Sequence, residues 1–240
     1  MRLMFPFLLA LAAQAQQRPA ARAEFEVVSV KPGDPSFPGT FARPGPGGLE
    51  MRNATLKNLL LYAYGLNEYQ LEGGLKWLDS AKFDIDAKYP AGAPASQAPL
   101  MMQAMLADRF KLQFHRETKV RPEYALVVAK GGPKLQAATE EEHPSSSQGD
   151  RLLKGSALPT SRLASMLIGV VGAPVLDQTG LTGKYDVDLK FAPLLETAVE
   201  DENLPDIFAA LQDKLGLKLE AIKGPVEVLV IDRAEMPTAN

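Results

Sequence analysis

The chain of 240 residues contains no cysteine and only two histidines, His115 and His143. The lack of cysteine excludes disulfides, cysteine-ligated zinc, iron–sulfur clusters and cysteine nucleophiles. Two histidines are too few for a histidine-rich metal centre, and we expect no metal site and no cofactor. Lysine and arginine (26) do not exceed aspartate and glutamate (29), which gives a net charge of −3. We therefore expect no nucleic-acid partner, because such proteins usually carry a basic excess.

Long apolar runs are scarce as well, and the clearest one lies at the amino terminus. Arg2 precedes an apolar stretch over 3–13, which is too short to span a bilayer. Ala13 and Ala15 then provide the small side chains of a signal-peptidase site. The sequence therefore predicts a signal peptide over 1–15, no membrane span after its removal, and a periplasmic or secreted protein. An exported chain without cysteine is typical of a bacterial envelope rather than of disulfide-rich secretion.

Two stretches of the chain resemble each other in the order of their residue types. Residues 83–89 match 185–191 class for class, and 106–114 match 211–219. An ordered series of matches indicates an internal repeat. We therefore predict two tandem homologous α+β repeats, with the following organisation: a signal peptide over 1–15, an N-terminal strand and Pro/Gly-rich loop over 16–48, a first repeat over 49–135, a polar linker over 136–150 and a second repeat over 151–240.

Periodicity predicts the elements of the first repeat. Apolar residues at helical spacing over 55–64 indicate a helix, with Thr55 as the N-cap and Gly65 as its end. Strict alternation over 83–89 is typical of a strand with one buried face. The remaining elements are a helix over 101–109, strands over 110–114 and 124–129, and a hairpin between them over 117–121.

The second repeat is expected to follow the same order. A helix begins near Pro205, and strands cover 217–219 and 226–231. An additional strand over 25–30 precedes both repeats. Residues 32–48 hold five prolines and five glycines, which predicts a loop, and the linker over 136–150 is also expected to lack elements. The predicted class is α+β, with helices packed on small, mainly antiparallel sheets.

Four aspartates form the sharpest polar pattern in the sequence: Asp84, Asp86, Asp186 and Asp188. Residues two apart on a strand share a face, at a separation that suits acid–base work on a glycoside or the binding of a hard cation. The alternative is that each pair belongs to the solvated face of an amphipathic strand, which Lys88 and Lys190 complete.

Other candidate groups are fewer. Trp77, with Tyr62, Tyr64 and Tyr69 nearby in sequence, could form an aromatic platform for a sugar, although core packing also accounts for a lone tryptophan. His115 is expected at the surface. The segment 177–180 has the pattern of a Gly-rich turn. None of the common hydrolase, metalloprotease or phosphate-binding motifs occurs, and no catalytic residue is assigned.

Several segments together resemble one protein family. Residues 25–32, 77–86, 106–112, 177–186 and 230–237 are similar to the soil-associated family of exported proteins of unknown function that is abundant in acidobacterial genomes. That resemblance implies a protein outside the cytoplasm with no established activity, since members are exported or follow a membrane metallopeptidase sensor domain. Each half also loosely resembles the short N-terminal domains of secretins and TonB-dependent receptors, which are periplasmic interaction modules.

These observations favour a non-catalytic binding or protein-interaction module of the bacterial envelope. Its partner would be an envelope protein, met by addition of a strand to a sheet edge, or a polysaccharide. The alternative is a carboxylate-dependent hydrolase of envelope or soil polysaccharide that uses Asp84, Asp86, Asp186 or Asp188.

Overall fold

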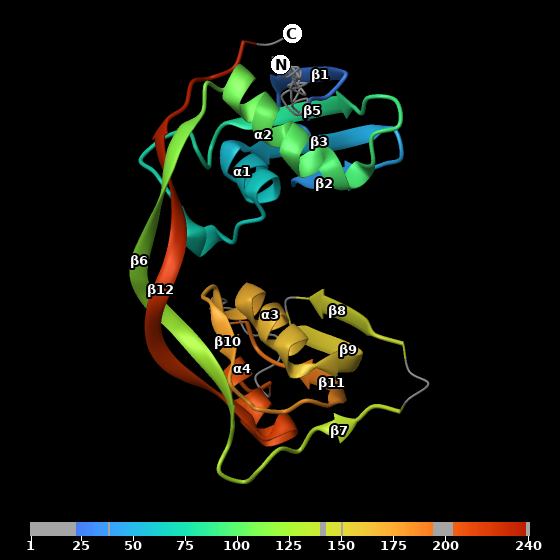
Figure 1. Cartoon of the computed structure of the whole chain (residues 1–240), viewed down its shortest axis with the longest axis vertical. Helices are drawn as coiled ribbons and strands as arrows, with labels where there is room; N and C mark the ends of the chain where they lie inside the picture. Colours follow the sequence, from blue (N-terminus) through green and yellow to red (C-terminus); the bar gives the residue numbers. More distant parts are fainter. Residues whose placement is uncertain (1–22, 38, 140–142, 150, 194–203, 239–240) are drawn as a thin grey trace, which may run out of the picture.

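The computed structural model describes residues 23–37, 39–139, 143–149, 151–193 and 204–238. They form two α+β lobes that a long two-stranded ribbon connects, with lobe 1 above and lobe 2 below in Figure 1. The α+β class predicted from the sequence is therefore correct. The predicted signal peptide, 1–15, lies outside the described residues. In the part that is described, no helix is both long and apolar enough to cross a membrane.

Lobe 1 is built on a four-stranded antiparallel sheet in the order β1-β5-β3-β2. The alternation predicted over 83–89 is present in the fourth strand of this sheet in sequence, since Phe83, Ile85 and Ala87 are buried. The predicted N-cap is also correct, because the Thr55 side chain accepts a hydrogen bond from the backbone N–H of Asn58. The elements of this lobe are β1 (Val27–Pro32), β2 (Phe41–Pro44), β3 (Gly48–Thr55), α1 (Leu56–Tyr64), η1 (Glu68–Gln70), β4 (Leu71–Glu72), β5 (Lys82–Lys88), η2 (Ala95–Gln97) and α2 (Ala98–Arg109).

Lobe 2 has a four-stranded antiparallel sheet in the order β7-β11-β9-β8. In each lobe the first helix directly follows an inner strand, which is β3 or β9, and ends at a left-handed glycine, Gly65 or Gly172. The elements are β7 (Gln136–Ala137), β8 (Ser145–Gly149), β9 (Leu152–Pro159), α3 (Thr160–Val171), β10 (Val175–Asp177), β11 (Lys184–Lys190), α4 (Ile207–Ala210) and the short π-helix η3 (Leu211–Leu215).

The ribbon consists of β6 (Gln113–Val128) and β12 (Leu217–Arg233), paired antiparallel over nearly their whole length. β6 starts in lobe 1 and ends in lobe 2, where β10 pairs with it; β12 runs the opposite way and pairs with β4 of lobe 1. Leu126 of β6 is therefore buried in the core of lobe 2, while Leu229 and Ile231 of β12 are buried in the core of lobe 1. Each lobe is completed by a strand that begins in the other.

The hairpin predicted over 117–121 is wrong, because this segment is the middle of the continuous strand β6. Likewise, the strands predicted over 217–219 and 226–231 are parts of the single strand β12. The charged residues of the predicted turn pair with β12 instead, as Lys119 does with Val226. A partner far away in the sequence thus supplies the hydrogen bonds that keep this polar segment extended.

Two predicted loops also contain strands. The Pro/Gly-rich segment 32–48 includes β2 and the first residue of β3, and the predicted linker 136–150 includes β7 and β8. All three short strands β2, β7 and β8 lie at sheet edges. An edge strand needs only one hydrogen-bonded neighbour and buries little, so it shows neither alternation nor a high apolar content.

Candidate functional site

Asp84 and Asp186 each lie opposite an irregularity in the strand pairing of their sheet, and the two irregularities match. In each lobe two residues of the inner strand oppose one aspartate of β5 or β11, which is the arrangement of a β-bulge. The second bulge residue, Asn53 or Ala157, has a φ of 50° in both lobes. Asp84 Oδ1 accepts the backbone N–H of Asn53 at 2.9 Å, and Asp186 Oδ1 accepts that of Ala157 at 3.0 Å. These two carboxylates therefore accept hydrogen bonds from the backbone, whereas the carboxylates of a purely solvated strand face would be hydrated.

Asp86 and Asp188 are exposed and ion-paired. Asp86 Oδ1 lies 2.7 Å from a guanidinium nitrogen of Arg52, and Asp188 Oδ2 lies 3.5 Å from Lys154 Nζ. The solvated-face interpretation thus describes this pair. The structure places the two aspartate pairs in different lobes and does not bring all four together (Figure 1). Among the described residues no group of three or more His, Asp or Glu side chains is arranged to hold a metal ion.

Trp77 belongs to the aromatic packing of lobe 1. Its ring centroid lies 6.3 Å from that of Phe83 and 6.5 Å from that of Phe110. Tyr64 packs instead on Phe114, at 4.9 Å. These contacts favour the core-packing interpretation of Trp77 over a sugar platform.

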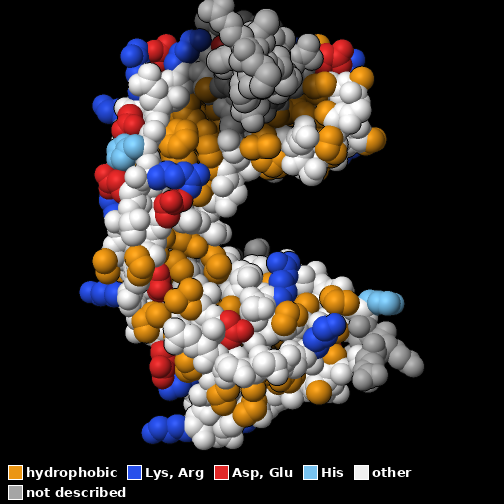
Figure 2. Space-filling model, viewed as in Figure 1, with side chains coloured by type: hydrophobic (Ala, Val, Ile, Leu, Met, Phe, Trp, Pro, Cys, Tyr) orange, Lys and Arg blue, Asp and Glu red, His pale blue; other side chains and the backbone are white. Residues whose placement is uncertain are grey.

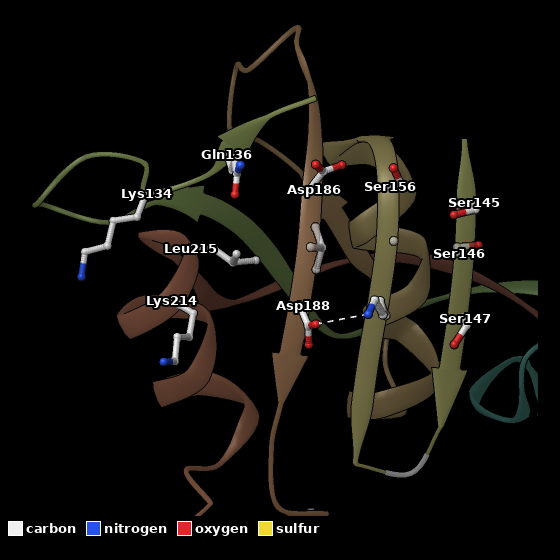
Figure 3. A pocket seen from close by; sticks show the side chains of 13 residues that line it. Lys134, Gln136, Ser145, Ser146, Ser147, Ser156, Asp186, Asp188, Lys214 and Leu215 are labelled. Carbon is white, nitrogen blue, oxygen red and sulfur yellow. Dashed lines mark ion pairs between the residues drawn. The ribbon is translucent and has the colours of Figure 1, made fainter. Parts of the chain in front are cut away.

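A cavity of about 610 Å³ lies on the sheet of lobe 2, and we call it the lobe 2 cavity. Figure 3 shows it from the face opposite α3, with serines along β8, Ser156 on β9, and Asp186 and Asp188 on β11. The π-helix η3 borders it on the other side. Its lining consists of Lys134, Gln136, Ser145, Ser146, Ser147, Lys154, Gly155, Ser156, Asp186, Val187, Asp188, Lys214 and Leu215.

Strand alternation explains why polar groups gather there. Leu153, Val187 and Leu189 point toward the helices and are buried in the lobe 2 core. Their neighbours Lys154 and Asp188 face the opposite side, because successive side chains of a strand alternate. The pairing of β8 with β9 then sets Ser145 beside Ser156 and Ser147 beside Lys154. The result is a polar surface across three strands.

The polar groups of the cavity retain hydrogen-bonding capacity. Within the described residues, the hydroxyls of Ser145, Ser147 and Ser156 make no hydrogen bond to other protein groups, and Lys214 has no ion-pair partner. Lys134 Nζ donates to the backbone oxygen of Asp213, at 3.1 Å. The cavity thus offers hydroxyls and ammonium groups to a ligand.

The corresponding part of lobe 1 is arranged differently. There Arg43 and Arg52 take the positions of Ser147 and Ser156. Arg43 pairs with Glu50 of β3 as Ser147 pairs with Lys154 of β9. Arg52 and Ser156 are each the first residue of their bulge. Arg43 pairs with Glu50 at 2.8 Å, and Arg52 pairs with Glu50 at 2.9 Å in addition to Asp86. The hydrogen bond to Asp86 raises the pKa of Arg52 above its ordinary value. A groove of about 760 Å³ does lie on this face, but it runs beside the turn between β2 and β3.

Sequence reasoning identified only Asp186 and Asp188 among the residues of the lobe 2 cavity. The sequence predicts a linker where Gln136 and the serines of β8 lie, and it contains no pattern that singles out Lys134 or Lys214. One usable signal exists: Lys154 and Ser156 alternate with Leu153 and Ala157, which places them together on the solvent face of a strand. Their juxtaposition with β8 depends on register, which the sequence does not reveal.

The fold and this cavity define a two-lobed α+β protein with a polar ligand-sized site on one sheet. Residues 57–234 match the family model described as "Protein of unknown function (DUF3738)", and the chain belongs to this family. No curated protein and no solved structure matches the chain. This match supports the resemblance to an uncharacterised family, whose description assigns no activity.

Proposed function

We propose that this protein is an exported, non-catalytic binding module that holds a segment of polysaccharide in the lobe 2 cavity. The observation that carries the proposal is the group of three serine hydroxyls, Ser145, Ser147 and Ser156, that have no protein partner within the described residues. A hydroxyl both donates and accepts, so it complements the hydroxyls of a sugar. The volume of about 610 Å³ lies within the range of small-ligand sites, roughly 300–1,000 Å³.

The charges of the cavity favour an acidic polysaccharide. Three lysines line it against two aspartates. Asp186 is engaged with the N–H of Ala157, and Asp188 is paired with Lys154. Lys134 and Lys214 therefore remain to attract an anionic group such as the carboxylate of a uronic acid.

The same contacts argue for binding rather than hydrolysis. A glycosidase needs two carboxyl groups that are free to act on one bond, as acid and as base or nucleophile. In the lobe 2 cavity one carboxylate accepts a backbone hydrogen bond and the other is ion-paired, as described above. The position of Asp186 and Asp188 in the lining of the cavity is the one observation that suits the hydrolase alternative, and the contacts of both carboxylates argue against it.

Titration calorimetry tests this proposal, with an oligogalacturonate as the acidic probe and a cello-oligosaccharide as the neutral one. We expect heat of binding for the acidic probe. The variant Ser156→Arg introduces the residue that lobe 1 has at this position and should weaken binding about tenfold or more, because the long side chain fills the cavity and pairs with Asp188. Ser80→Arg, at an exposed position in lobe 1, is the matched control.

Three results would overturn the proposal. The first is the absence of binding by both probes, and the second is binding that Ser156→Arg leaves unchanged. The third is a steady release of reducing ends during incubation, which Asp188→Asn abolishes, because it would establish the hydrolase.

We also propose export, with cleavage after Ala15 and a mature chain that begins at Gln16. This places the protein in the periplasm or outside the cell. Sequencing of the amino terminus of exported material should return Gln16, whereas Met1 would contradict the proposal. The resemblance to the exported, soil-associated family supports it.

We infer further that 49–135 and 151–240 are homologous repeats, each extended by the edge strands that precede it, β1 and β2 in lobe 1 and β7 and β8 in lobe 2. The matched strand orders, the left-handed residues Asn53 and Ala157 in equivalent bulges, and the crossed strands β6 and β12 all support common descent. The looser likeness of each half to the interaction modules of secretins and TonB-dependent receptors agrees with a binding role.

A further inference from the structure

The edge strand β8 has unusual properties for the border of a sheet. It covers Ser145–Gly149, has β9 as its one partner among the described strands, and exposes all five of its residues. It contains no charge and no proline, and its pairing with β9 has no register shift. Proteins normally protect such an edge with charges, prolines or bulges, because unpaired backbone groups invite another strand.

The other sheet edges of the described residues are short or protected. β4, β7 and β10 have two or three residues each, which is too few to hold an added strand. β1 carries Lys31 and ends in Pro32, and β2 carries Arg43 and ends in Pro44. In lobe 1, therefore, the edge equivalent to β8 is closed by the devices that β8 lacks.

The position of β8 leaves it accessible. It lies on the side of lobe 2 that faces lobe 1, and the space between the lobes is open to solvent in the space-filling view (Figures 1 and 2). The carbonyl oxygen of Ser145 lies 3.2 Å from the position that a Cβ would take on Gly155 of β9, so it points toward β9. Because backbone groups alternate along an antiparallel strand, Ser146 and Gln148 direct theirs toward the open side.

A cation lies beside this edge on the helix side of the sheet. Arg162 of α3 donates to the hydroxyl of Ser146 at 3.2 Å and has no carboxylate partner among the described residues. A side chain that stood opposite Ser146 on an added strand would therefore meet a guanidinium. This favours an acidic residue at that position of the incoming strand.

We propose that β8 is a docking edge for an extended polypeptide segment of a partner protein, which adds as a strand and places a carboxylate next to Arg162. Backbone hydrogen bonds to Ser146 and Gln148 would provide affinity, and the acidic side chain would provide selectivity. This interaction uses the edge of the sheet, whereas the polysaccharide of the proposed function would lie on its face. The two activities can therefore fail independently.

Fluorescence anisotropy tests the proposal with a labelled peptide of seven residues that alternates threonine and valine and has a central glutamate. We expect it to bind at least about fivefold more tightly than the same peptide with a central lysine. Ser146→Pro removes an outward N–H and should weaken binding about tenfold or more. Arg162→Glu should reverse the preference between the two peptides, and Ser156→Arg should leave peptide binding unchanged.

The reversal by Arg162→Glu keeps the test decisive even if Ser146→Pro disturbs the fold, because Arg162 is an exposed helix residue. The proposal is overturned if neither peptide binds, or if Arg162→Glu does not alter the preference. It is also overturned if sedimentation shows a dimer that Ser146→Pro dissociates, since β8 would then pair with a second copy of this chain.

Discussion

The sheets of the two lobes have the same strand order but present opposite kinds of surface. In lobe 1, Arg43 and Arg52 both pair with Glu50, and Arg52 also pairs with Asp86, so these long side chains neutralise one another's charges. In lobe 2, serines at two of these positions expose hydroxyls and leave a cavity. Residues at equivalent register positions thus decide whether a sheet face presents paired charges beside its groove, as in lobe 1, or unpaired hydroxyls within it, as in lobe 2.

The two bulges differ in a similar way. Asn53 and Ala157 have the same left-handed backbone, yet Asn53 Nδ2 donates to the carbonyl oxygens of Asp34 at 3.0 Å and Phe37 at 2.8 Å. Ala157 has no polar side chain with which to compensate for its backbone strain. At the bulge, lobe 1 thus has two side-chain hydrogen bonds that lobe 2 lacks, and lobe 2 has an alanine in a strained left-handed conformation.

The largest effect should come from weakening the core of lobe 2 at a residue of the ribbon strand β6. Leu126→Ala lies in the core of lobe 2 and should lower the free energy of unfolding by roughly 2–5 kcal/mol. Trp77 is the single tryptophan and lies in lobe 1, so its fluorescence reports on the other lobe. Because the lobes exchange strands, we expect the urea midpoint of Trp77 fluorescence to fall in this variant.

Val120→Ala is the control for this experiment, because Val120 lies on the same strand and is 75% exposed. It should change the free energy of unfolding by less than about 0.5 kcal/mol and therefore shift the urea midpoint little. If Leu126→Ala leaves the urea midpoint of Trp77 fluorescence unchanged, the lobes unfold independently.

The bulges should give the next largest difference. Asn53→Ala removes the two hydrogen bonds that the Asn53 side chain donates to backbone carbonyl oxygens, and it leaves an alanine in the left-handed conformation. It should therefore destabilise the protein by about 2–3 kcal/mol. Ala157→Gly relieves the strain in lobe 2 and should be neutral or stabilising by up to about 1 kcal/mol. Chemical denaturation measures both, and equal losses at the two sites would contradict the comparison.

The aspartates should separate into two classes. Asp84→Ala and Asp186→Ala each remove the acceptor of a bulge N–H and should cost about 1–2 kcal/mol. Asp86→Ala and Asp188→Ala each break an exposed ion pair and should cost less than about 1 kcal/mol. Thermal melts of the four variants test this order. A uniform small effect would restore the solvated-face interpretation for all four.

The smallest effect concerns the surface of the ribbon. The hydrogen bond to Glu117, and then that to Asp232, raises the pKa of His115 above its ordinary value of 6.5, and the hydrogen bond to His115 lowers the pKa of Glu117 below 4.5. The stabilisation from His115 is full below 6.5 and is lost as the pH rises through its raised pKa. That from Glu117 is full above 4.5 and is lost as the pH falls through its lowered pKa.

The two contributions are therefore fully present together between pH 4.5 and 6.5. An NMR titration of the His115 ring should show a midpoint above 6.5 that falls in Asp232→Asn and in Glu117→Gln. A midpoint that neither variant moves would mean that the carboxylates do not contact the ring in solution.

Local signals in the sequence predicted local structure well. The alternation around Ile85 and the capping pattern of Thr55 act between neighbouring residues, and both are present in the structure. The ribbon could not be predicted, because the pairing of Lys119 with Val226 joins segments far apart in the chain. The lining of the lobe 2 cavity could be predicted only in part for the same reason. Asp186 belongs to a local sequence pattern, whereas the positions of Ser145 and Lys214 near it depend on sheet register and on helix packing.

The exchange of strands also determines when the protein can finish folding. The core of lobe 1 needs Leu229 and Ile231, although most of this lobe precedes residue 113. During synthesis from the amino terminus, lobe 1 must wait for nearly the entire chain before its sheet and core are complete. Contacts between such distant residues are slow to form, so the core of lobe 1 stays incomplete until the last strand of the chain has been made.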